Sequence, residues 1–264
     1  MDNDNKASDD HFYDYYAQES IGTSTYNRFV SIKKLVYSFL DMNGMNCSNH
    51  IVLDIGCGAG TQCILWAEDG HQVSGIDINE KLVQLAKSRA LESNVNIDYQ
   101  VGTATQLPWE DKKFSICLAP ELLEHVPDWE QCLDELARVT AENGVLFIST
   151  NNVLCPIQKE FELPMYSWYP RKLKRYYERV AVTERPEIVN YAKYPAVNWF
   201  SYYSLRDALA KRGFTSYDRF DLTNSNGDSI GKKLLIKSIR SNILIRWMAH
   251  VATSYTVIVA IRDS

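Results

Sequence analysis

The chain has 264 residues, of which 45% are hydrophobic, and a net charge of −5. This length allows one large α/β domain with or without a smaller cap, and the acidic balance gives no reason to expect nucleic-acid binding. No apolar run is long enough to span a bilayer and no signal-peptide pattern opens the chain, so we expect a soluble, cytoplasmic protein.

The six cysteines all lie in the first part of the chain, and none forms a C-x-x-C pair. Most of them sit in segments that are typical of core or turn. We therefore expect free thiols in a reducing compartment, rather than disulfides or a zinc site. The cysteines are Cys47, Cys57, Cys63, Cys117, Cys132 and Cys155.

Residues 1–45 are predicted to form an N-terminal helical segment that precedes the main domain. Residues 1–10 are polar and acidic, which is typical of disorder, and aromatic residues follow from His11. Apolar residues between Phe29 and Leu40 recur at helical spacing and predict an amphipathic helix. Either this helix packs on a sheet edge, or the segment is a lid that covers a ligand. The candidate substrate-contacting tyrosines are Tyr15, Tyr16 and Tyr26.

A glycine-rich turn follows the first predicted strand. Residues 51–60 form an apolar run that contains Asp54 and ends in alternating glycines. Glycine suits a turn between a buried strand and a helix, because a Cβ would block both the turn and the approach of a ligand. This segment therefore predicts a nucleotide-binding turn.

Strands and helices then alternate up to residue 150. Helices are expected over 61–69, with Gly70 as the stop, from Asn79 to about residue 92, and from Asp128 onward. Further strands are expected over 72–77, 97–101, 114–119 and 144–150. This alternation indicates βαβ units and a mainly parallel α/β sheet with helices on both faces.

Residues 151–201 interrupt the alternation with interleaved aromatic and basic residues, and with prolines that prevent one long helix. We predict an inserted cap over the carboxyl ends of the strands, where open α/β sheets bind ligands. Its aromatic residues either pack on the sheet edge, enclose a flat or apolar acceptor, or contact a membrane surface. In the second case, Trp168 and Trp199 would contact the substrate.

After the cap, we expect a helix over 204–212 that stops at Gly213, and strands over 214–222 and 255–262. Residues 234–251 predict one amphipathic, basic helix, for which core packing and membrane contact both stay open. The main domain would thus comprise residues 46–264, with the cap as an insertion.

Two acidic residues bear on the ligand of the glycine turn. Asp54 would repel a pyrophosphate, whereas it suits an ammonium-bearing ligand. Asp77 stands at the end of the second strand, where a carboxylate can accept both ribose hydroxyls. Together with a G-x-G-x-G spacing instead of G-x-G-x-x-G, they favour a nucleoside without phosphates over NAD.

Four motifs in residues 51–150 carry a family resemblance. They are V-L-D-I-G-C-G-A-G, G-I-D-I-N, G-T-A-T-Q-L-P-W-E-D-K-K-F-S-I and P-E-L-L-E-H-V-P-D. In order and spacing they resemble the class I S-adenosylmethionine-dependent methyltransferases, most of all the ubiquinone-biosynthesis O-methyltransferase type. The resemblance implies a Rossmann-like seven-stranded sheet, mostly parallel with the last strand antiparallel, and S-adenosylmethionine as the cofactor.

The resemblance also implies a set of cofactor-binding residues. They are Asp54, Gly56, Cys57, Gly58, Gly60, Asp77, Ile78, Thr103, Ala104 and Ala119. The first five would face the methionine part, Asp77 the ribose, Ile78 the adenine ring, and Ala119 the sulfonium end. Thr103 and Ala104 would meet the adenine edge. Family members usually have Asp at the position of Thr103, whose hydroxyl accepts more weakly, so the Ala104 backbone is expected to dominate.

Glu121, Glu124 and His125 form an E-x-x-E-H pattern. In the ubiquinone type and in small-RNA terminal 2′-O-methyltransferases it resembles a site for Mg²⁺, Mn²⁺ or Zn²⁺, which would lower the pKa of an acceptor hydroxyl. Alternatively, the motif is that of metal-free relatives. The candidate catalytic residues Glu124 and His125 would then position the loop, and His125 would take a proton from the acceptor or orient it. The RNA enzymes have a further histidine downstream. This chain has none between His125 and His250, so no nucleic acid is expected as substrate.

The predicted activity is methyl transfer from S-adenosylmethionine to a small-molecule acceptor, foremost to a hydroxyl of a phenolic, quinol-like or sugar compound. N- or C-methylation, cofactor binding without transfer, and an NAD-dependent oxidoreductase are the alternatives. The acceptor and the oligomeric state are not predicted.

Overall fold

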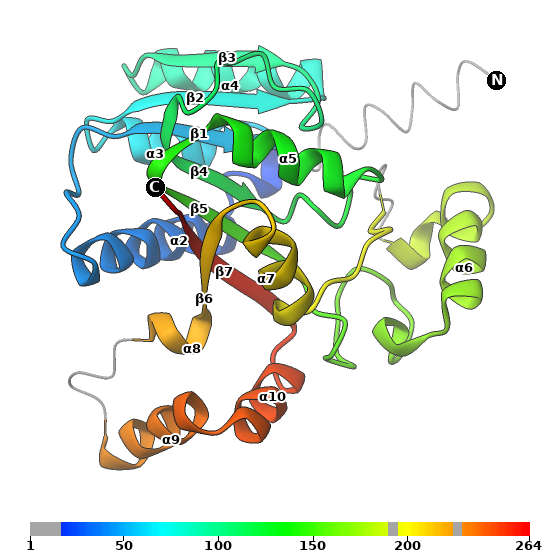
Figure 1. Cartoon of the computed structure of the whole chain (residues 1–264). Helices are drawn as coiled ribbons and strands as arrows, with labels where there is room; N and C mark the ends of the chain where they lie inside the picture. Colours follow the sequence, from blue (N-terminus) through cyan, green and yellow to red (C-terminus); the bar gives the residue numbers. More distant parts are fainter. Residues whose placement is uncertain (1–16, 190–194, 224–228) are drawn as a thin grey trace.

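The computed structural model of the chain describes residues 17–189, 195–223 and 229–264. At its centre is a seven-stranded sheet with the order β3-β2-β1-β4-β5-β7-β6 (Figure 1). Strands β3, β2, β1, β4 and β5 run parallel, and β7 is antiparallel to β5 and β6, which confirms the predicted Rossmann-like sheet. The strands are β1 (Ile51–Ile55), β2 (Gln72–Asp77), β3 (Ile97–Val101), β4 (Phe114–Pro120), β5 (Thr140–Asn151), β6 (Phe214–Asp218) and β7 (Tyr255–Arg262).

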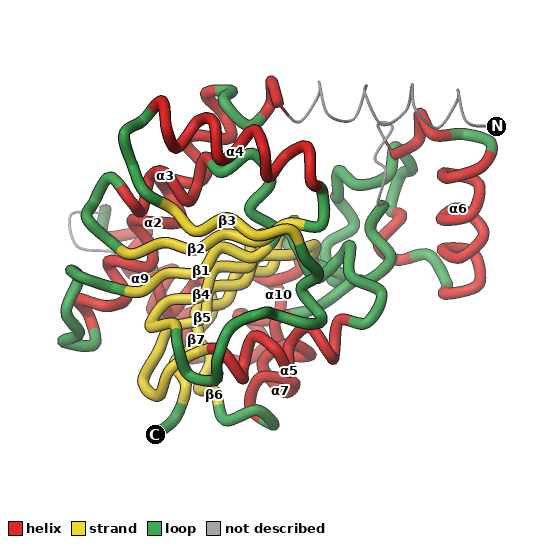
Figure 2. The backbone as a smooth tube through the Cα atoms, turned by 90° about the horizontal axis from the view of Figure 1, so that it is seen from above, coloured by secondary structure: helices red, strands yellow, loops and turns green. Residues whose placement is uncertain are grey.

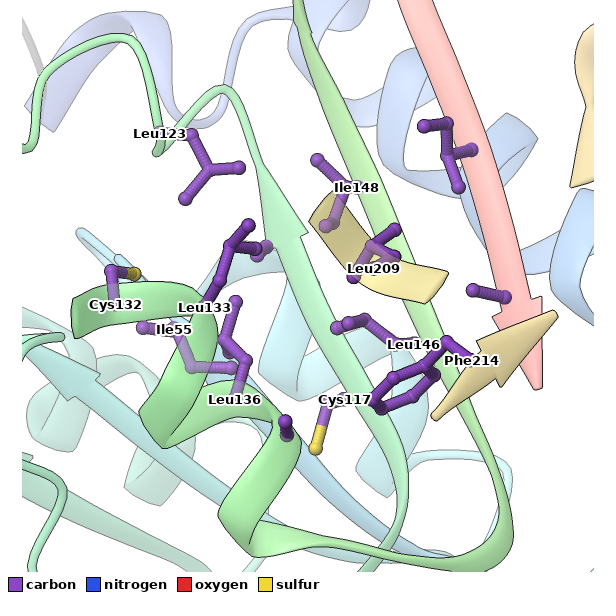
Figure 3. Close-up of a cluster of buried hydrophobic side chains, with 14 of the residues drawn as sticks. Ile55, Cys117, Leu123, Cys132, Leu133, Leu136, Leu146, Ile148, Leu209 and Phe214 are labelled. Carbon is purple, nitrogen blue, oxygen red and sulfur yellow. The ribbon is translucent and has the colours of Figure 1, made fainter. Parts of the chain in front are cut away.

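Helices cover both faces of the sheet (Figure 2). They include α2 (Thr23–Met42), α3 (Thr61–Ala67), α4 (Glu80–Glu92), α5 (Trp129–Val139) and α7 (Tyr202–Ala210). On one face, α2, α3 and α4 bury apolar residues such as Val36 and Trp66. On the other, α5 and α7 pack Leu133 and Leu209 into the cluster shown in Figure 3. The two cores fix the strands, so that the residues at their carboxyl ends are held in place.

Side-chain caps begin two of these helices where the sequence predicts. Asn79 accepts a hydrogen bond from the backbone N–H of Leu82, and Asp128 accepts one from that of Gln131. All six cysteines are free thiols, as expected, and all but Cys47 are buried.

Three predicted boundaries in the last third of the chain are wrong, each because a polar side chain caps a helix. Helix α7 begins at Tyr202 rather than at residue 204, because Ser201 forms a capping box. Strand β6 ends at Asp218, whose side chain starts the short helix α8 (Arg219–Leu222). The single helix over 234–251 is in fact two, α9 (Ile230–Ser241) and α10 (Ile243–Val251). They separate at Asn242, which caps α10.

The cap follows β5 and lies beyond the carboxyl edge of the sheet (Figure 1). It contains two short 3₁₀ helices, η1 (Tyr166–Trp168) and η2 (Pro186–Val189), and helix α6 (Arg171–Thr183). Its buried aromatic residues form a small core of their own, in which Phe161 stacks on Tyr166. These aromatic residues of the cap therefore pack on one another, whereas Phe200 at its end joins the core of the sheet. In the part of the chain that the structure describes, no helix is long and apolar enough to cross a membrane.

Candidate active site

A cavity of about 490 Å³ lies at the carboxyl ends of β1, β2 and β4. Its walls are the glycine turn, the loops after β2, β3 and β4, and the start of α2. The predicted cofactor residues that line it are Asp54, Gly56, Cys57, Gly58, Asp77, Ile78, Thr103 and Ala104. Gly60 and Ala119 do not line it, although Ala59 and Pro120 beside them do. The structure thus gathers most of the predicted cofactor set in one place.

The glycines of the turn adopt the left-handed conformation that the sequence predicts. The φ angles of Gly56, Gly58 and Gly60 are 76°, 50° and 81°. A Cβ on Gly60 would lie 2.3 Å from Tyr99 Oη and 2.8 Å from Ala86 Cβ. Gly60 is therefore required by the packing behind the turn, and not by the approach of a ligand.

Most backbone N–H groups of the turn are bonded within the protein. Those of Gly56 and Cys57 donate to the carbonyl of Ile76 at 2.8 and 3.0 Å, and that of Gly58 donates to Asp77 Oδ2 at 2.9 Å. A phosphate cradle needs such groups to point at the ligand. This turn instead uses them to join β1 to β2 and to fix Asp77.

Asp77 presents an anchored carboxylate at the end of β2. Besides Gly58, the backbone N–H of Asn79 donates to its Oδ1 at 2.8 Å. Each oxygen keeps a further acceptor position, because a carboxylate oxygen can accept two hydrogen bonds. Burial raises the pKa of this carboxyl, although the two backbone donors oppose that shift.

Asp54 is almost fully buried on the cavity wall. Gln62 Nε2 donates to its Oδ1 at 2.9 Å, and Cys63 Sγ lies 3.4 Å from its Oδ2. Burial raises the pKa of Asp54 to about 7, because desolvation of the charged form outweighs these two hydrogen bonds. A cationic group in the cavity would stabilise the ionised form.

The loop after β3 forms the wall beside Ile78, which is exposed on the cavity side. The hydroxyl of Thr103 lies 2.9 Å from that of Thr105 and accepts from the Thr105 backbone N–H at 3.3 Å. Thr103 is therefore engaged in its own loop. The neighbouring Ala104 lines the cavity and is half-buried.

The residues just before α2 and the first turns of α2 supply a further wall of the cavity. Glu19, Ser20, Thr25, Arg28 and Phe29 line the cavity. Thr61 Oγ1 donates to the carbonyl of Ser20 at 2.8 Å, and Arg28 forms an ion pair with Glu121 of the loop after β4. The N-terminal segment thus both packs on the sheet, through the later turns of α2, and walls the cavity. No local pattern marks Arg28, since its partner is 93 residues away.

The loop after β4 brings His125 to the cavity, with Nδ1 buried and without a hydrogen-bond partner among the described residues. Glu124 is almost fully buried beside it and does not line the cavity, and burial raises its pKa to about 8. The end of the cap holds this loop. Asn198 Nδ2 donates to the carbonyls of Leu123 and Val126 at 3.0 and 2.7 Å. The backbone N–H of Asn198 donates to the Glu124 carbonyl at 3.1 Å.

The predicted metal site is not assembled. Across residues 17–189, 195–223 and 229–264, no three His, Cys, Asp or Glu side chains are placed to hold a metal ion. Glu121 is paired with Arg28, and Glu124 is buried away from the cavity. The Glu121, Glu124 and His125 set therefore does not fit a metal in this arrangement.

Three of the five predicted substrate residues lie elsewhere. Trp168 is half exposed in the cap and donates from Nε1 to the carbonyl of Leu154 at 3.0 Å. Trp199 packs against the small core of the cap, with the Lys174 ammonium 4.5 Å from its ring centroid. Tyr26 is exposed on α2. None of these three is among the residues that line the cavity, and Tyr15 and Tyr16 lie outside the described residues.

Residues 53–148 match the model of the methyltransferase domain family. The match runs from β1 to β5 and so includes the glycine turn, Asp77 and the loop that carries His125. Over these residues the chain is therefore similar to the methyltransferase domain family.

Among curated proteins, the chain is similar to the ubiquinone biosynthesis O-methyltransferase of Chelativorans sp. (strain BNC1), with 36% identity over 131 residues. This covers 47% of the chain and 51% of that protein, so the chain spans about half the length of the curated relatives it matches.

Two solved structures share the fold. An S-adenosylmethionine dependent methyltransferase from Mesorhizobium loti has a TM-score of 0.53 at 16% identity, over 81% of this chain and 92% of that one. The [4+2]-cyclase SpnF has a TM-score of 0.50 at 17% identity, over 82% and 75%. At such identities the likeness concerns the fold alone, and the fold hosts more than one chemistry.

Proposed function

We propose that this protein transfers a methyl group from S-adenosylmethionine to a hydroxyl of a small molecule. The observation that carries the proposal is the pair of carboxylates, Asp54 and Asp77, around a turn in which most backbone N–H groups are bonded within the protein. A pyrophosphate would meet negative charge and few donors there. A nucleoside that bears a sulfonium and an ammonium group would meet two acceptors of the right sign.

The lining residues suggest how the cofactor lies. Asp77 would accept hydrogen bonds from the ribose hydroxyls, Ile78 would pack on the adenine ring, and the Ala104 backbone would meet the adenine edge. Asp54 would face the amino-acid end. When bound, S-adenosylmethionine supplies an electrophilic methyl group. The ion pair of Arg28 and Glu121 would close the cavity on the acceptor side and exclude water from it.

His125 is the residue best placed to act on the acceptor. His125 lines the cavity, so its imidazole would take the hydroxyl proton as the acceptor oxygen attacks the methyl carbon. Much of the rate of such a transfer comes from the alignment of the reacting groups. Glu124 is mostly protonated at pH 7 because its pKa is raised to about 8, so it would position the loop instead of taking the proton.

The relatives' printed names support oxygen as the methylated atom and an aromatic acceptor related to quinones. We therefore propose phenolic or quinol-like compounds as acceptors. N- or C-methylation uses the same scaffold and is the alternative that the same acceptor panel tests.

The test is transfer of a radiolabelled methyl group from S-adenosylmethionine to a panel of phenols, catechols, quinols, amines and activated carbon acids. We expect label in the hydroxyl acceptors, and His125→Ala should lower kcat about 100-fold. The matched control is His50→Ala, since His50 does not line the cavity. Label found only in the amines or carbon acids would contradict O-methylation, and no label in any acceptor would contradict methyl transfer to these classes.

A further inference from the structure

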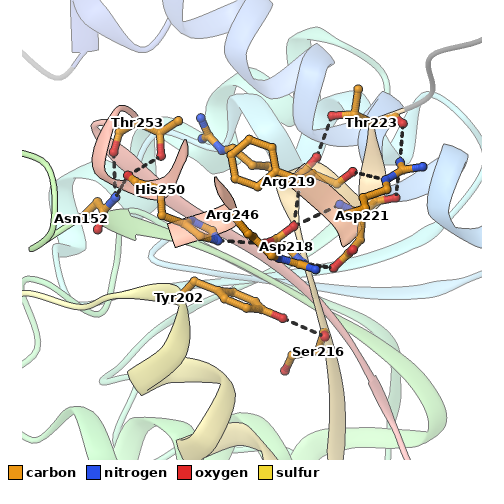
Figure 4. Close-up of polar contacts among 12 residues, drawn as sticks. Asn152, Tyr202, Ser216, Asp218, Arg219, Asp221, Thr223, Arg246, His250 and Thr253 are labelled. Carbon is orange, nitrogen blue, oxygen red and sulfur yellow. Dashed lines mark hydrogen bonds and ion pairs between the residues drawn. The ribbon is translucent and has the colours of Figure 1, made fainter. Parts of the chain in front are cut away.

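Helix α10 turns two polar residues inward, beside the partly buried Ile245 and Ala249, and leaves four large apolar residues exposed. Arg246 Nε and His250 Nε2 each lie 2.8 Å from Asp218 Oδ2, and this carboxylate is fully buried (Figure 4). The opposite side of the helix is apolar and exposed, and consists of Ile243, Leu244, Trp247 and Met248. A surface helix of a globular protein normally shows the reverse pattern. The buried ion pairs hold α10 in this orientation.

Helix α9 extends the same surface. Its Ile236 and Ile239 pack on Phe220 and anchor the helix. Ile230, Leu234 and Leu235 are exposed, at 78%, 60% and 56%. We define the α9–α10 apolar face as Ile230, Leu234, Leu235, Ile243, Leu244, Trp247 and Met248. In Figure 1 the two helices project away from the sheet, below the strand ends.

The segment that carries this face is basic, although the chain as a whole is acidic. No Asp or Glu occurs between residues 229 and 262, while the whole chain has a net charge of −5. Lys233 and Lys237 on α9 are exposed. Positive charge beside an apolar face with a tryptophan is the combination that suits the headgroup region of an anionic bilayer.

We propose that the α9–α10 apolar face binds the surface of a bilayer that contains anionic lipids. The helices have 12 and 9 residues, so they would lie in the interface and not cross it. Leu234, Leu244 and Met248 would enter the acyl boundary, Trp247 would sit at headgroup level, and the lysines would contact lipid phosphates. A second copy of this chain is a poorer occupant, because two basic faces repel each other.

Flotation of the full chain with lipid vesicles tests the proposal. Vesicles of phosphatidylcholine alone are compared with vesicles that contain about 30% phosphatidylglycerol, at low and high salt. We expect at least tenfold stronger binding to the anionic vesicles, and a loss of that preference at high salt. The Trp247 fluorescence, taken as the difference between wild type and Trp247→Phe, should shift to shorter wavelength on binding.

Two double variants separate the apolar and the charge contributions. Leu244→Gln/Trp247→Gln should weaken vesicle binding by at least tenfold, and Lys233→Glu/Lys237→Glu should remove the preference for anionic lipid. The matched control is Lys87→Glu/Leu91→Gln on α4, where both residues are exposed. Binding of S-adenosylhomocysteine should be unchanged in all of them and reports that each variant is folded, because none of these residues lines the cavity.

Absence of vesicle binding by the wild type, or equal binding by wild type and both double variants, would overturn the proposal. Sedimentation velocity supplies a second criterion. A dimer that Leu244→Gln dissociates, without any vesicle binding, would assign the face to a second copy and also overturn the bilayer proposal.

Discussion

Asp54 is the residue whose charge state matters most for a cationic ligand. Burial raises its pKa to about 7, so the carboxyl is mostly neutral below that pH and mostly ionised above it. Only the ionised carboxylate attracts an ammonium or sulfonium group. Protonation of Asp54 as the pH falls should therefore weaken the binding of a cationic ligand.

We therefore predict that the affinity for S-adenosylhomocysteine rises by up to about tenfold from pH 6 to pH 8. The ionised fraction of one group with a pKa near 7 increases about tenfold over this range, and this increase limits the effect. Calorimetric titration across this range measures it. The control is Asp54→Asn, which keeps the shape of the side chain and should flatten the profile. A steep rise that persists in Asp54→Asn would assign the titration to another group.

At the scale of elements, the cap positions the loop after β4 through Asn198. Its side chain satisfies the carbonyls of Leu123 and Val126, on both sides of His125. If methyl transfer takes place as proposed, Asn198→Ala should lower kcat about tenfold and leave the affinity for S-adenosylhomocysteine within twofold, since alignment is lost while the cofactor walls are kept.

Asn46→Ala is the control for this change, because Asn46 lies far from the cavity lining. If Asn198→Ala lost cofactor affinity and kcat together, the cap would be supporting the whole domain, and not this loop in particular.

The orientation of α10 depends on Asp218. Burial alone would raise the pKa of this carboxyl, but the hydrogen bonds from His250 and Arg246 outweigh it and lower the pKa to about 2. The stabilisation is therefore complete above about pH 4 and is lost as the pH falls towards 2. Asp218→Asn should reduce the free energy of unfolding by about 3 kcal/mol, because it leaves the Arg246 guanidinium without its buried charged partner.

Urea denaturation at pH 7 measures the effect of Asp218→Asn, with Asp98→Asn on the exposed side of β3 as control. A loss similar to that of the control would mean that the buried ion pairs contribute little net stability.

At the scale of the whole molecule, local patterns predict most of the fold and part of the site. The β-strand and helix alternation, the glycines of the turn, Asp54 and Asp77 are all encoded within short stretches, and the structure places them as expected. The remaining site residues depend on contacts between distant segments. Arg28 forms an ion pair with Glu121, and Asn198 donates hydrogen bonds to the loop that carries His125. Neither contact produces a periodic pattern in the sequence.

The C-terminal helices show a second limit. Hydrophobic periodicity assumes that the apolar side of a helix faces the core. In α10 the buried side holds Arg246 and His250 against Asp218, beside Ile245 and Ala249, so the periodicity predicts a helix but does not show which side is buried. Hydrophobic periodicity also does not reveal that the helix divides in two at Asn242, because a single capping side chain causes the break.

The central claim is that the cavity at the carboxyl ends of β1 and β2 accepts a nucleoside with an amino-acid group instead of a dinucleotide. Calorimetric titration of the full chain with S-adenosylhomocysteine and with NAD, at pH 8, tests it most directly. We predict that S-adenosylhomocysteine binds with one site per chain and at least tenfold more tightly than NAD, and that Asp77→Ala weakens it. Tighter binding of NAD would contradict the account.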